Sequence, residues 1–254
     1  MDMPVNHFKR ALAEGRPQIG LWSSLCNSIA AEVIAGCGFD WIVLDGEHAP
    51  NDISTLVPQL QAFNASPTTP VVRAAWNDMV LFKRILDIGA QTILVPYVQT
   101  AEEARRAVAA TRYPPVGVRG VATSMRASRF GRVKDYFSLV QNEICLLVQA
   151  ETREALKNLE AIAAVDGVDG VFLGPADLAA DMGHLGQTRH ADVFAAFADA
   201  LKRLQKIGKP AGTLTPNEAD AQKFLDDGFT FVAVGSDVGL LARGGEALAQ
   251  RFKK

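Results

Sequence analysis

Short runs of apolar residues recur along the whole chain, and a longer polar or amphipathic stretch separates each run from the next. Most of these runs are continuously apolar rather than alternating, which is typical of strands buried on both faces of a parallel sheet. The pattern predicts eight strands, over residues 19–25, 41–45, 70–74, 92–98, 144–149, 170–173, 210–214 and 230–235.

The stretches between these strands carry apolar residues three or four positions apart, the spacing of an amphipathic helix. Residues 78–88 place Leu81, Ile85 and Ile88 on one predicted face, and the Ala- and Arg-rich residues 102–111 predict a second helix. A third helix is predicted over residues 190–207, with an apolar face made of Phe194, Phe197, Leu201 and Leu204. Glycines just before strands predict helix ends in the left-handed conformation; they are Gly38, Gly89, Gly167, Gly208 and Gly228.

Strands and helices alternate over 254 residues, and no low-complexity linker divides them. A single closed (β/α)8 TIM barrel over residues 1–254 is therefore the predicted fold. The alternative is a doubly wound sheet, which would normally carry a glycine-rich fingerprint after its first strand. The Gly36-Cys37-Gly38 segment instead precedes a predicted strand.

Composition and charge narrow the functional classes. Hydrophobic residues make up 48% of the chain and the net charge is −2, so nothing favours a nucleic acid or an anionic membrane as a partner. No apolar run approaches the roughly 20 residues of a membrane span, and the first residues lack the apolar core of a secretion signal. The three cysteines form no C-x-x-C pair. We expect reduced, buried thiols and a cytoplasmic location.

Ionisable residues follow several of the predicted strands directly. The strand at 41–45 runs into Asp45-Gly46-Glu47-His48, and the next strand carries Arg73 at its end. Two later strands lead to Glu151 and to the segment Gly174-Pro175-Ala176-Asp177. The carboxyl ends of barrel strands meet at one mouth, where TIM barrels build their active sites. These residues therefore predict an active site.

Glu151 and Asp177 predict a cation site. Two carboxylates without a nearby His or Cys offer hard oxygen ligands, which suit Mg²⁺ or Mn²⁺ better than zinc. The simpler alternative is a helix-capping Asp and a surface Glu. Pro175 fits the first turn of a helix, so the N–H groups of Ala176 and Asp177 could bind a carboxylate. Together the cation and these N–H groups would chelate a 2-oxo acid.

The other ionisable residues predict acid–base and electrostatic roles. Arg73 could stabilise an enolate oxygen, or bridge to a loop on the surface. His48 is a candidate general base that the Asp45 carboxylate would orient, and Glu47 either supports the cation site or is a bystander. The remaining histidines, His7, His184 and His190, lack such neighbours and are predicted to be surface residues. No lysine ends a predicted strand, so an imine mechanism is not expected.

Residues 113–136 form the longest irregular region, and no acidic residue occurs from 117 to 134. A long loop in a compact domain is usually functional. This one could be solvated, contact another subunit, or close over the substrate. Its arginines Arg119, Arg126 and Arg129 would suit an aldehyde that bears a carboxylate, such as succinic semialdehyde.

Five segments together resemble the HpcH/HpaI aldolase family. They are Pro17-Gln18-Ile19-Gly20-Leu21-Trp22, Asp45-Gly46-Glu47-His48-Ala49-Pro50-Asn51, Pro70-Val71-Val72-Arg73, Thr111-Arg112-Tyr113-Pro114-Pro115 and Gly174-Pro175-Ala176-Asp177-Leu178. The resemblance runs nearly end to end. It implies a class II pyruvate aldolase that reversibly cleaves 4-hydroxy-2-oxo acids to pyruvate and an aldehyde, with Mg²⁺, Mn²⁺ or Co²⁺ as the cofactor and no organic cofactor.

The same resemblance implies roles for individual residues. Glu151 and Asp177 would bind the metal, Arg73 would stabilise the pyruvate enolate, and His48 with Asp45 would form the acid–base pair. Glu47, Asp87 and Arg119 would support the site or reach that of a neighbouring subunit. The implied substrate-binding residues are Trp22, Gln149, Gly174, Pro175, Ala176, Asp177 and Leu214.

The resemblance also implies a hexamer, a trimer of dimers in which the last helix packs on a partner subunit. The region around Thr213, Leu214 and Thr215, where the aldehyde would lie, is less apolar than the family pattern. The aldehyde preference therefore stays open. Three alternatives to the implied activity are an aldolase for 2-keto-3-deoxy sugar acids, a CoA-ester lyase of the citramalyl type, and a non-catalytic barrel that binds 2-oxo acids.

Overall fold

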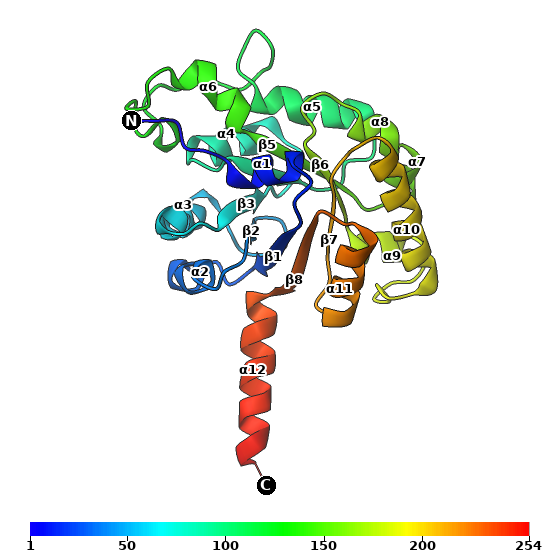
Figure 1. Cartoon of the computed structure of the whole chain (residues 1–254). Helices are drawn as coiled ribbons and strands as arrows, with labels where there is room; N and C mark the ends of the chain where they lie inside the picture. Colours follow the sequence, from blue (N-terminus) through cyan, green and yellow to red (C-terminus); the bar gives the residue numbers. More distant parts are fainter. Residues whose placement is uncertain (254) are drawn as a thin grey trace.

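The computed structural model describes residues 1–253 as a closed barrel of eight parallel strands in sequence order, surrounded by helices (Figure 1). The predicted (β/α)8 barrel is thus confirmed. The strands are β1 (Gln18–Ser23), β2 (Trp41–Asp45), β3 (Thr69–Arg73), β4 (Thr92–Val95), β5 (Cys145–Ala150), β6 (Gly170–Leu173), β7 (Ala211–Leu214) and β8 (Phe231–Ser236).

Helices of very different length precede, connect and follow the strands. They are α1 (His7–Ala13), α2 (Ser28–Ala35), α3 (Ile53–Ala62), α4 (Met79–Asp87), α5 (Ala101–Thr111), α6 (Tyr136–Glu143), α7 (Arg153–Lys157), α8 (Leu159–Ala163), α9 (Pro175–Asp181), α10 (Ala191–Lys206), α11 (Glu218–Asp227) and α12 (Asp237–Phe252), with 3-10 turns η1 (Phe63–Ala65) and η2 (Arg126–Ser128). None of the helices within residues 1–253 is both long and apolar enough to cross a membrane.

The predicted strands were correct in number and order, and two of them ran two or more residues past the observed end. β4 ends at Val95 because Pro96 has no N–H to donate and Tyr97 takes a left-handed φ of 56°. β1 ends at Ser23, two residues before the predicted end. All five glycines predicted to end helices do adopt positive φ values.

Two predicted helix faces needed adjustment. In α4 the buried residues are Phe82, Ile85 and Leu86, whereas Leu81 and Ile88 are only partly buried. The face that meets the barrel is therefore rotated by about one residue from the predicted one. In α10 the buried set includes Phe197, Leu201 and Leu204 as predicted, and Phe194 lies at its margin.

Aromatic side chains fill the interior of the barrel from its amino end to its mouth. Phe8 of α1 closes the amino end and packs on Trp41 and Phe231, with ring centroids 5.5 and 5.8 Å apart. Phe172 lies against Phe231 and, at 5.6 Å, against Trp22. The barrel is therefore solid, and only its carboxyl end is available for chemistry.

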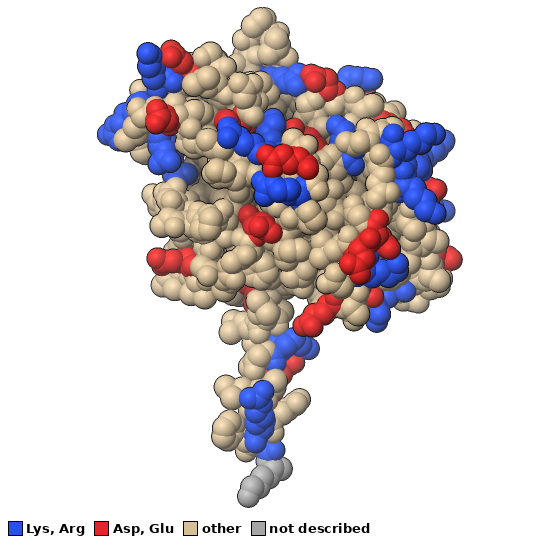
Figure 2. Space-filling view, viewed as in Figure 1, with Lys and Arg blue, Asp and Glu red and all other residues tan. Residues whose placement is uncertain are grey.

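Helix α12 points away from the barrel (Figure 1). Asp237 is its only buried residue, and its carboxylate accepts hydrogen bonds from the Ser23 hydroxyl at 2.9 Å and from the Ser24 and Leu25 N–H groups. The rest of the helix exposes Val238, Leu240, Leu241, Leu248 and Phe252. Charges of both signs are interspersed over the barrel face in Figure 2, and α12 stands out below it.

The long loop at residues 113–136 packs on the amino end of its own barrel. Arg119 is buried, pairs with Asp87 at 2.7 Å and lies 4.6 Å from the Tyr113 ring centroid. Arg126 donates to the Ile88 carbonyl at 2.6 Å, just after α4 ends. Within one chain, this loop therefore does not close over the mouth.

Candidate active site

The register between β2 and β3 creates a buried ion pair at the mouth. Asp45 and Arg73 are paired across the two strands. The Arg73 Nε donates to Asp45 Oδ1 at 2.9 Å, and its Nη2 donates to Oδ2 at 2.7 Å. Both side chains are almost fully buried. This bidentate geometry fixes the guanidinium plane.

Two more groups hold the same guanidinium. Arg73 Nη1 lies 2.7 Å from Glu47 Oε2, and its carbon lies 4.8 Å from the Trp22 ring centroid. Trp22 also donates from Nε1 to Asp45 at 3.2 Å. Arg73 is therefore enclosed by an indole and two carboxylates, which suits a fixed positive charge at the mouth.

The two carboxylates beside Arg73 respond differently to burial. Burial acts to raise the pKa of Asp45, but the hydrogen bonds and charge of Arg73 outweigh it and lower that pKa. At Glu47 burial prevails over the charge of Arg73 and raises the pKa, and Asp45 and Asp177 add to the rise. Asp45 is thus the permanent partner of Arg73, and Glu47 is the more easily protonated one.

The predicted contact between the Asp45 carboxylate and the His48 ring is absent. The turn Gly46-Glu47-His48 wraps around Asp45, so that Oδ1 accepts from the Glu47 and His48 N–H groups at 3.0 and 3.3 Å. The His48 ring faces outward, 67% exposed, with Nε2 3.9 Å from Glu47. The prediction that His48 lies at the mouth was correct, but the sequence does not show which way its ring points.

Glu151 is buried at the end of β5 and has a strongly raised pKa. Its Oε1 accepts from the Tyr97 N–H at 2.7 Å, and Gln149 Nε2 bonds to its Oε2. Burial raises the pKa to about 7, Asp177 and Glu47 add to the rise, and the bonds from Gln149 and Tyr97 oppose it. Sequence reasoning missed Tyr97, because its left-handed backbone falls inside the region predicted as strand.

The turn between β6 and α9 places Asp177 near Glu151. Gly174 is the N-cap of α9, and because it has no side chain it cannot cap the helix with a side-chain hydrogen bond. Asp177 lies exposed in the first turn of this helix. A Cβ at position 174 would collide with the Glu151 carboxylate and lie 3.2 Å from Gln149 Nε2. Glycine is needed here because the helix start and the buried carboxylate approach so closely.

These carboxylates have the properties of a cation site. Glu47, Glu151 and Asp177 are close enough that Asp177 raises the pKa of both glutamates, and Glu47 raises that of Glu151. Arg73 is already paired with Asp45, and the buried Gln149 Oε1 has no hydrogen-bond partner. An all-oxygen donor set with uncompensated negative charge fits a divalent cation such as Mg²⁺.

A cavity of about 270 Å³ lies beside the mouth. Its walls include Leu214 and Thr215 from the end of β7, together with Pro175 and Ala176 from the start of α9. Thr213 does not contribute, because it is fully buried and donates to the Leu173 carbonyl at 3.0 Å. The cavity provides room next to the predicted chelation site.

Asp87 and Arg119 lie away from the mouth of their own barrel. Asp87 ends α4 just before β4 begins, so it is at the amino end of the barrel. The two residues pair with each other there. Any role in an active site would have to be in that of another subunit.

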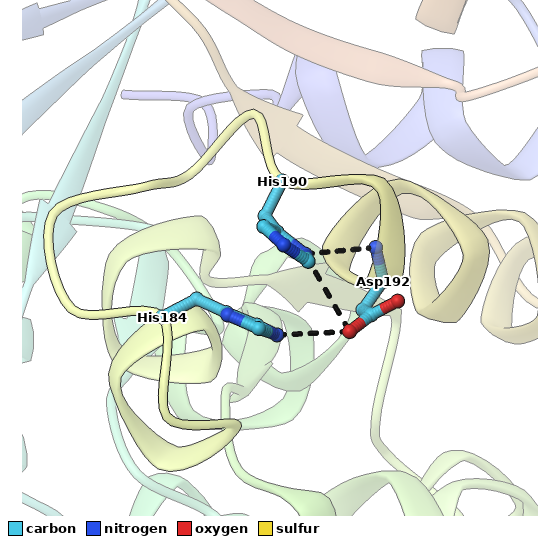
Figure 3. A group of neighbouring side chains, drawn as sticks. All are labelled: His184, His190 and Asp192. Atoms are coloured by element: carbon cyan, nitrogen blue, oxygen red, sulfur yellow. Dashed lines mark hydrogen bonds and ion pairs between the residues drawn. The ribbon is translucent and has the colours of Figure 1, made fainter.

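Two histidines predicted as isolated surface residues come together elsewhere. His184 and His190 stack with ring centroids 3.5 Å apart, beside Asp192 (Figure 3). Their side chains are 22% and 35% exposed, so both lie at the surface as predicted but are not isolated, and His7 is exposed as predicted. The spacing of the two histidines in the sequence does not predict their contact, because the conformation of the loop between them brings them together.

Comparison with known proteins gives matches along nearly the whole chain. Residues 18–244 match the family model described as HpcH/HpaI aldolase/citrate lyase. A pyruvate aldolase of Rhizobium etli is 61% identical, covering 99% of both chains. A 4-hydroxy-2-oxo-heptane-1,7-dioate aldolase of Klebsiella pneumoniae is 59% identical, covering 97% of this chain and 94% of its own. The crystal structure of an HpcH/HpaI aldolase/citrate lyase family protein from Burkholderia cenocepacia superposes with a TM-score of 0.95 at 39% identity, covering 98% of this chain and 100% of its own.

Proposed function

The chain belongs to the HpcH/HpaI aldolase/citrate lyase family and is a carbon–carbon lyase, and we propose that it is a class II pyruvate aldolase for 4-hydroxy-2-oxo acids. The observation that carries this proposal is the pairing at the mouth of a fixed guanidinium, Arg73, with a cluster of carboxylates. Such an arrangement can bind a 2-oxo acid and stabilise the negative charge that develops on its keto oxygen.

In this proposal Glu151 and Asp177 hold a divalent cation, which can be Mg²⁺, Mn²⁺ or Co²⁺. The bound cation would polarise the 2-oxo group as a Lewis acid. The all-oxygen donor set and the raised pKa of Glu151 support this role. A cation would also favour the ionised form of Glu151.

The substrate carboxylate would lie at the start of α9, against the N–H groups of Ala176 and Asp177 that follow Gly174 and Pro175. Gln149, whose Oε1 has no partner, and the Trp22 indole would complete this pocket. The aldehyde part would extend toward Leu214 and the adjoining cavity.

Arg73 and His48 would perform the chemistry. Arg73 donates from Nε and Nη2 to Asp45, and its Nη1 lies 2.7 Å from Glu47 Oε2 in an ion pair, so the remaining N–H groups of the guanidinium would stabilise the enolate oxygen. The exposed His48 ring would take the proton of the C4 hydroxyl, directly or through water. The C3–C4 bond then breaks, the aldehyde leaves, and the enolate is protonated to pyruvate.

The named relatives favour 4-hydroxy-2-oxoheptanedioate as substrate, with succinic semialdehyde as the second product. A 2-keto-3-deoxy sugar acid is the alternative. The hydroxyl of Thr215 in the wall of the adjoining cavity favours it, because this hydroxyl can bind a substrate hydroxyl group, whereas Arg189 in the same wall pairs with Asp220 at 2.7 Å. Comparing cleavage of both substrates would decide between them.

We further propose that the enzyme is a homo-oligomer, a trimer of dimers, in which α12 packs on a neighbouring barrel. The apolar side chains that α12 exposes support this, as do the exposed Ile29 and Val33 on α2. Asp87 would then reach the site of a neighbour. Of the three free cysteines, Cys145 is buried as predicted, whereas Cys26 is only partly buried and Cys37 is exposed. Thiols without a disulfide partner are consistent with a cytoplasmic enzyme.

The first test is pyruvate release from 4-hydroxy-2-oxoheptanedioate by chelator-stripped protein, with and without Mg²⁺, Mn²⁺ or Co²⁺. We expect the cation to restore cleavage, and Asp177→Asn to abolish that restoration. Asp181→Asn is the matched control, since Asp181 ends the same helix and pairs with Arg153 instead. Full activity without any cation would overturn the proposed roles of Glu151 and Asp177.

A further inference from the structure

Two histidines and an aspartate converge where α9 leads into α10 (Figure 3). Asp192 Oδ2 lies 2.9 Å from His184 Nε2 and 3.5 Å from His190 Nδ1. The three potential ligand atoms all lie within 4.8 Å of one another. The two rings stack with only 15° between their planes, so they present these nitrogens to the same oxygen.

We propose that His184, His190 and Asp192 form a second cation site, for a borderline metal ion of the Zn²⁺ class. Imidazole nitrogens suit zinc, whereas magnesium prefers oxygen ligands, so this site would differ in selectivity from the all-oxygen cluster at the mouth. Three protein ligands would leave one tetrahedral position open. The proposal does not depend on the aldolase mechanism.

The hydrogen bonds around His190 indicate that a bound cation, rather than a direct hydrogen bond, would link its ring to the Asp192 carboxylate. His190 is the N-cap of α10, and its Nδ1 accepts the Asp192 N–H at 3.2 Å. A nitrogen that accepts a hydrogen bond has no proton to donate, so Nδ1 and Asp192 Oδ2 face each other as two lone-pair atoms. A cation next to Nδ1 and Oδ2 would turn this unfavourable contact into two ligand bonds, with Nδ1 exchanging the N–H for the metal.

The connecting loop holds the donors in place before any metal binds. Gly183 and Gly186 adopt positive φ, and the His184 N–H donates to the Ala179 carbonyl at 2.7 Å. Gln187 and His190 each donate back within the loop, to the carbonyls of His184 and Gln187 at 2.8 and 2.9 Å. The side chains of His184, His190 and Asp192 are 22%, 35% and 60% exposed, so the histidines are partly shielded while the carboxylate is open to an ion from solvent. A bound ion would clamp the end of α9 to the start of α10.

The test measures Zn²⁺ binding by equilibrium dialysis and calorimetry on the full-length chain. The variant His184→Gln/His190→Asn removes both imidazoles, while Asn keeps an N-cap acceptor and Gln keeps a donor to Asp192. His7→Gln is the matched control, because His7 is an exposed histidine at the start of α1. Melting temperatures with and without Zn²⁺ give a second readout.

We expect the double variant to bind one Zn²⁺ fewer per chain than the wild type and the His7→Gln control. Loss of a residue that only hydrogen-bonds to a metal ligand typically lowers metal affinity by roughly 10- to 100-fold. The double variant loses two ligands themselves, so its Zn²⁺ affinity at this site should fall by more than that. Zn²⁺ should raise the melting temperature of the wild type more than that of the double variant. Equal stoichiometry and equal melting shifts in all three proteins would overturn the proposal. The Asp177→Asn variant distinguishes the second cation site from the proposed aldolase site. It removes a ligand at the mouth and should leave Zn²⁺ bound to His184, His190 and Asp192.

Discussion

At the scale of single residues, the mouth of the barrel is governed by one buried positive charge. Arg73 neutralises Asp45 and approaches Glu47, so it organises the site in addition to the enolate-stabilising role that we propose for it. Removing one partner of a buried ion pair leaves the other uncompensated, which typically costs about 3–5 kcal/mol. The catalytic role proposed for Arg73 therefore has to be tested with a variant that keeps the positive charge at this position.

We expect Arg73→Lys to lower kcat for pyruvate release by about 10²–10³-fold, because a lysine cannot reproduce the bidentate contact or the free N–H groups. Arg73→Ala should lose activity and also about 3 kcal/mol or more of unfolding free energy in urea. The control is Arg153→Ala, which breaks an exposed pair with Asp181 and should cost about 1 kcal/mol or less. Near wild-type turnover in Arg73→Lys would exclude the enolate-stabilising role.

The raised pKa of Glu151 predicts how stability depends on pH. In the folded protein this pKa is about 7, against 4.5 for an ordinary glutamate, so the folded state binds the proton more tightly than the unfolded state. Its stabilising contribution is present below pH 4.5 and is lost as pH rises through 7. The lowered pKa of Asp45 acts with the opposite sign, and only at more acidic pH.

We expect the unfolding free energy of cation-free protein to fall by up to about 3 kcal/mol between pH 5 and pH 8. Saturating Mg²⁺ should reverse the fall, since it binds the ionised form. Urea unfolding of the wild type and of Glu151→Gln at both pH values provides the measurement. The prediction is wrong if the two proteins show the same pH dependence without cation.

At the scale of elements, strand register and one tight turn position the site. The alignment of β2 with β3 places Asp45 opposite Arg73, and the turn from β6 into α9 brings Asp177 close to Glu151. The contact of Gly174 with Glu151 shows how little space this turn has. A methyl group there must displace the carboxylate.

We therefore expect Gly174→Ala to weaken Mg²⁺ binding by about 10-fold or more and to cost about 1–3 kcal/mol of stability. Gly36→Ala is the control, because a Cβ at the end of α2 would make only an ordinary 3.6 Å contact. Calorimetric titration with Mg²⁺ and urea unfolding measure the two effects. Unchanged binding in Gly174→Ala would show that Glu151 can move freely.

Elements whose pattern is local could be predicted from the sequence, whereas side-chain directions in loops could not. The apolar runs gave all eight strands, and the strand ends brought Asp45, Arg73 and Glu151 to one mouth. The outward turn of His48, the left-handed Tyr97 and the stacking of His184 on His190 depend on loop geometry. No periodicity in the sequence encodes these features.

At the scale of the whole molecule, the barrel and α12 form two very different surfaces. The barrel buries its core, whereas α12 buries only Asp237 and exposes a row of apolar side chains. An exposed apolar surface of this kind marks an interaction site. The proposed oligomer would bury it.

We expect Leu241→Asp/Leu248→Asp to convert the oligomer into smaller species, because both leucines are more than half exposed in the single chain. Multi-angle light scattering after gel filtration measures the mass. Glu246→Gln on the same helix is the control and should leave the mass unchanged. A monomeric wild-type protein would contradict the proposed assembly.

The aromatic filling of the barrel also constrains the order of events in turnover. Phe8, Trp41, Phe231 and Phe172 leave no passage through the barrel, so everything must enter and leave at the mouth. If pyruvate is held by the cation and the start of α9 while the aldehyde lies in the adjoining cavity without such ligands, the aldehyde departs first. In the reverse direction pyruvate would bind before the aldehyde, and the kinetics would be those of a compulsory-order mechanism with a single entrance.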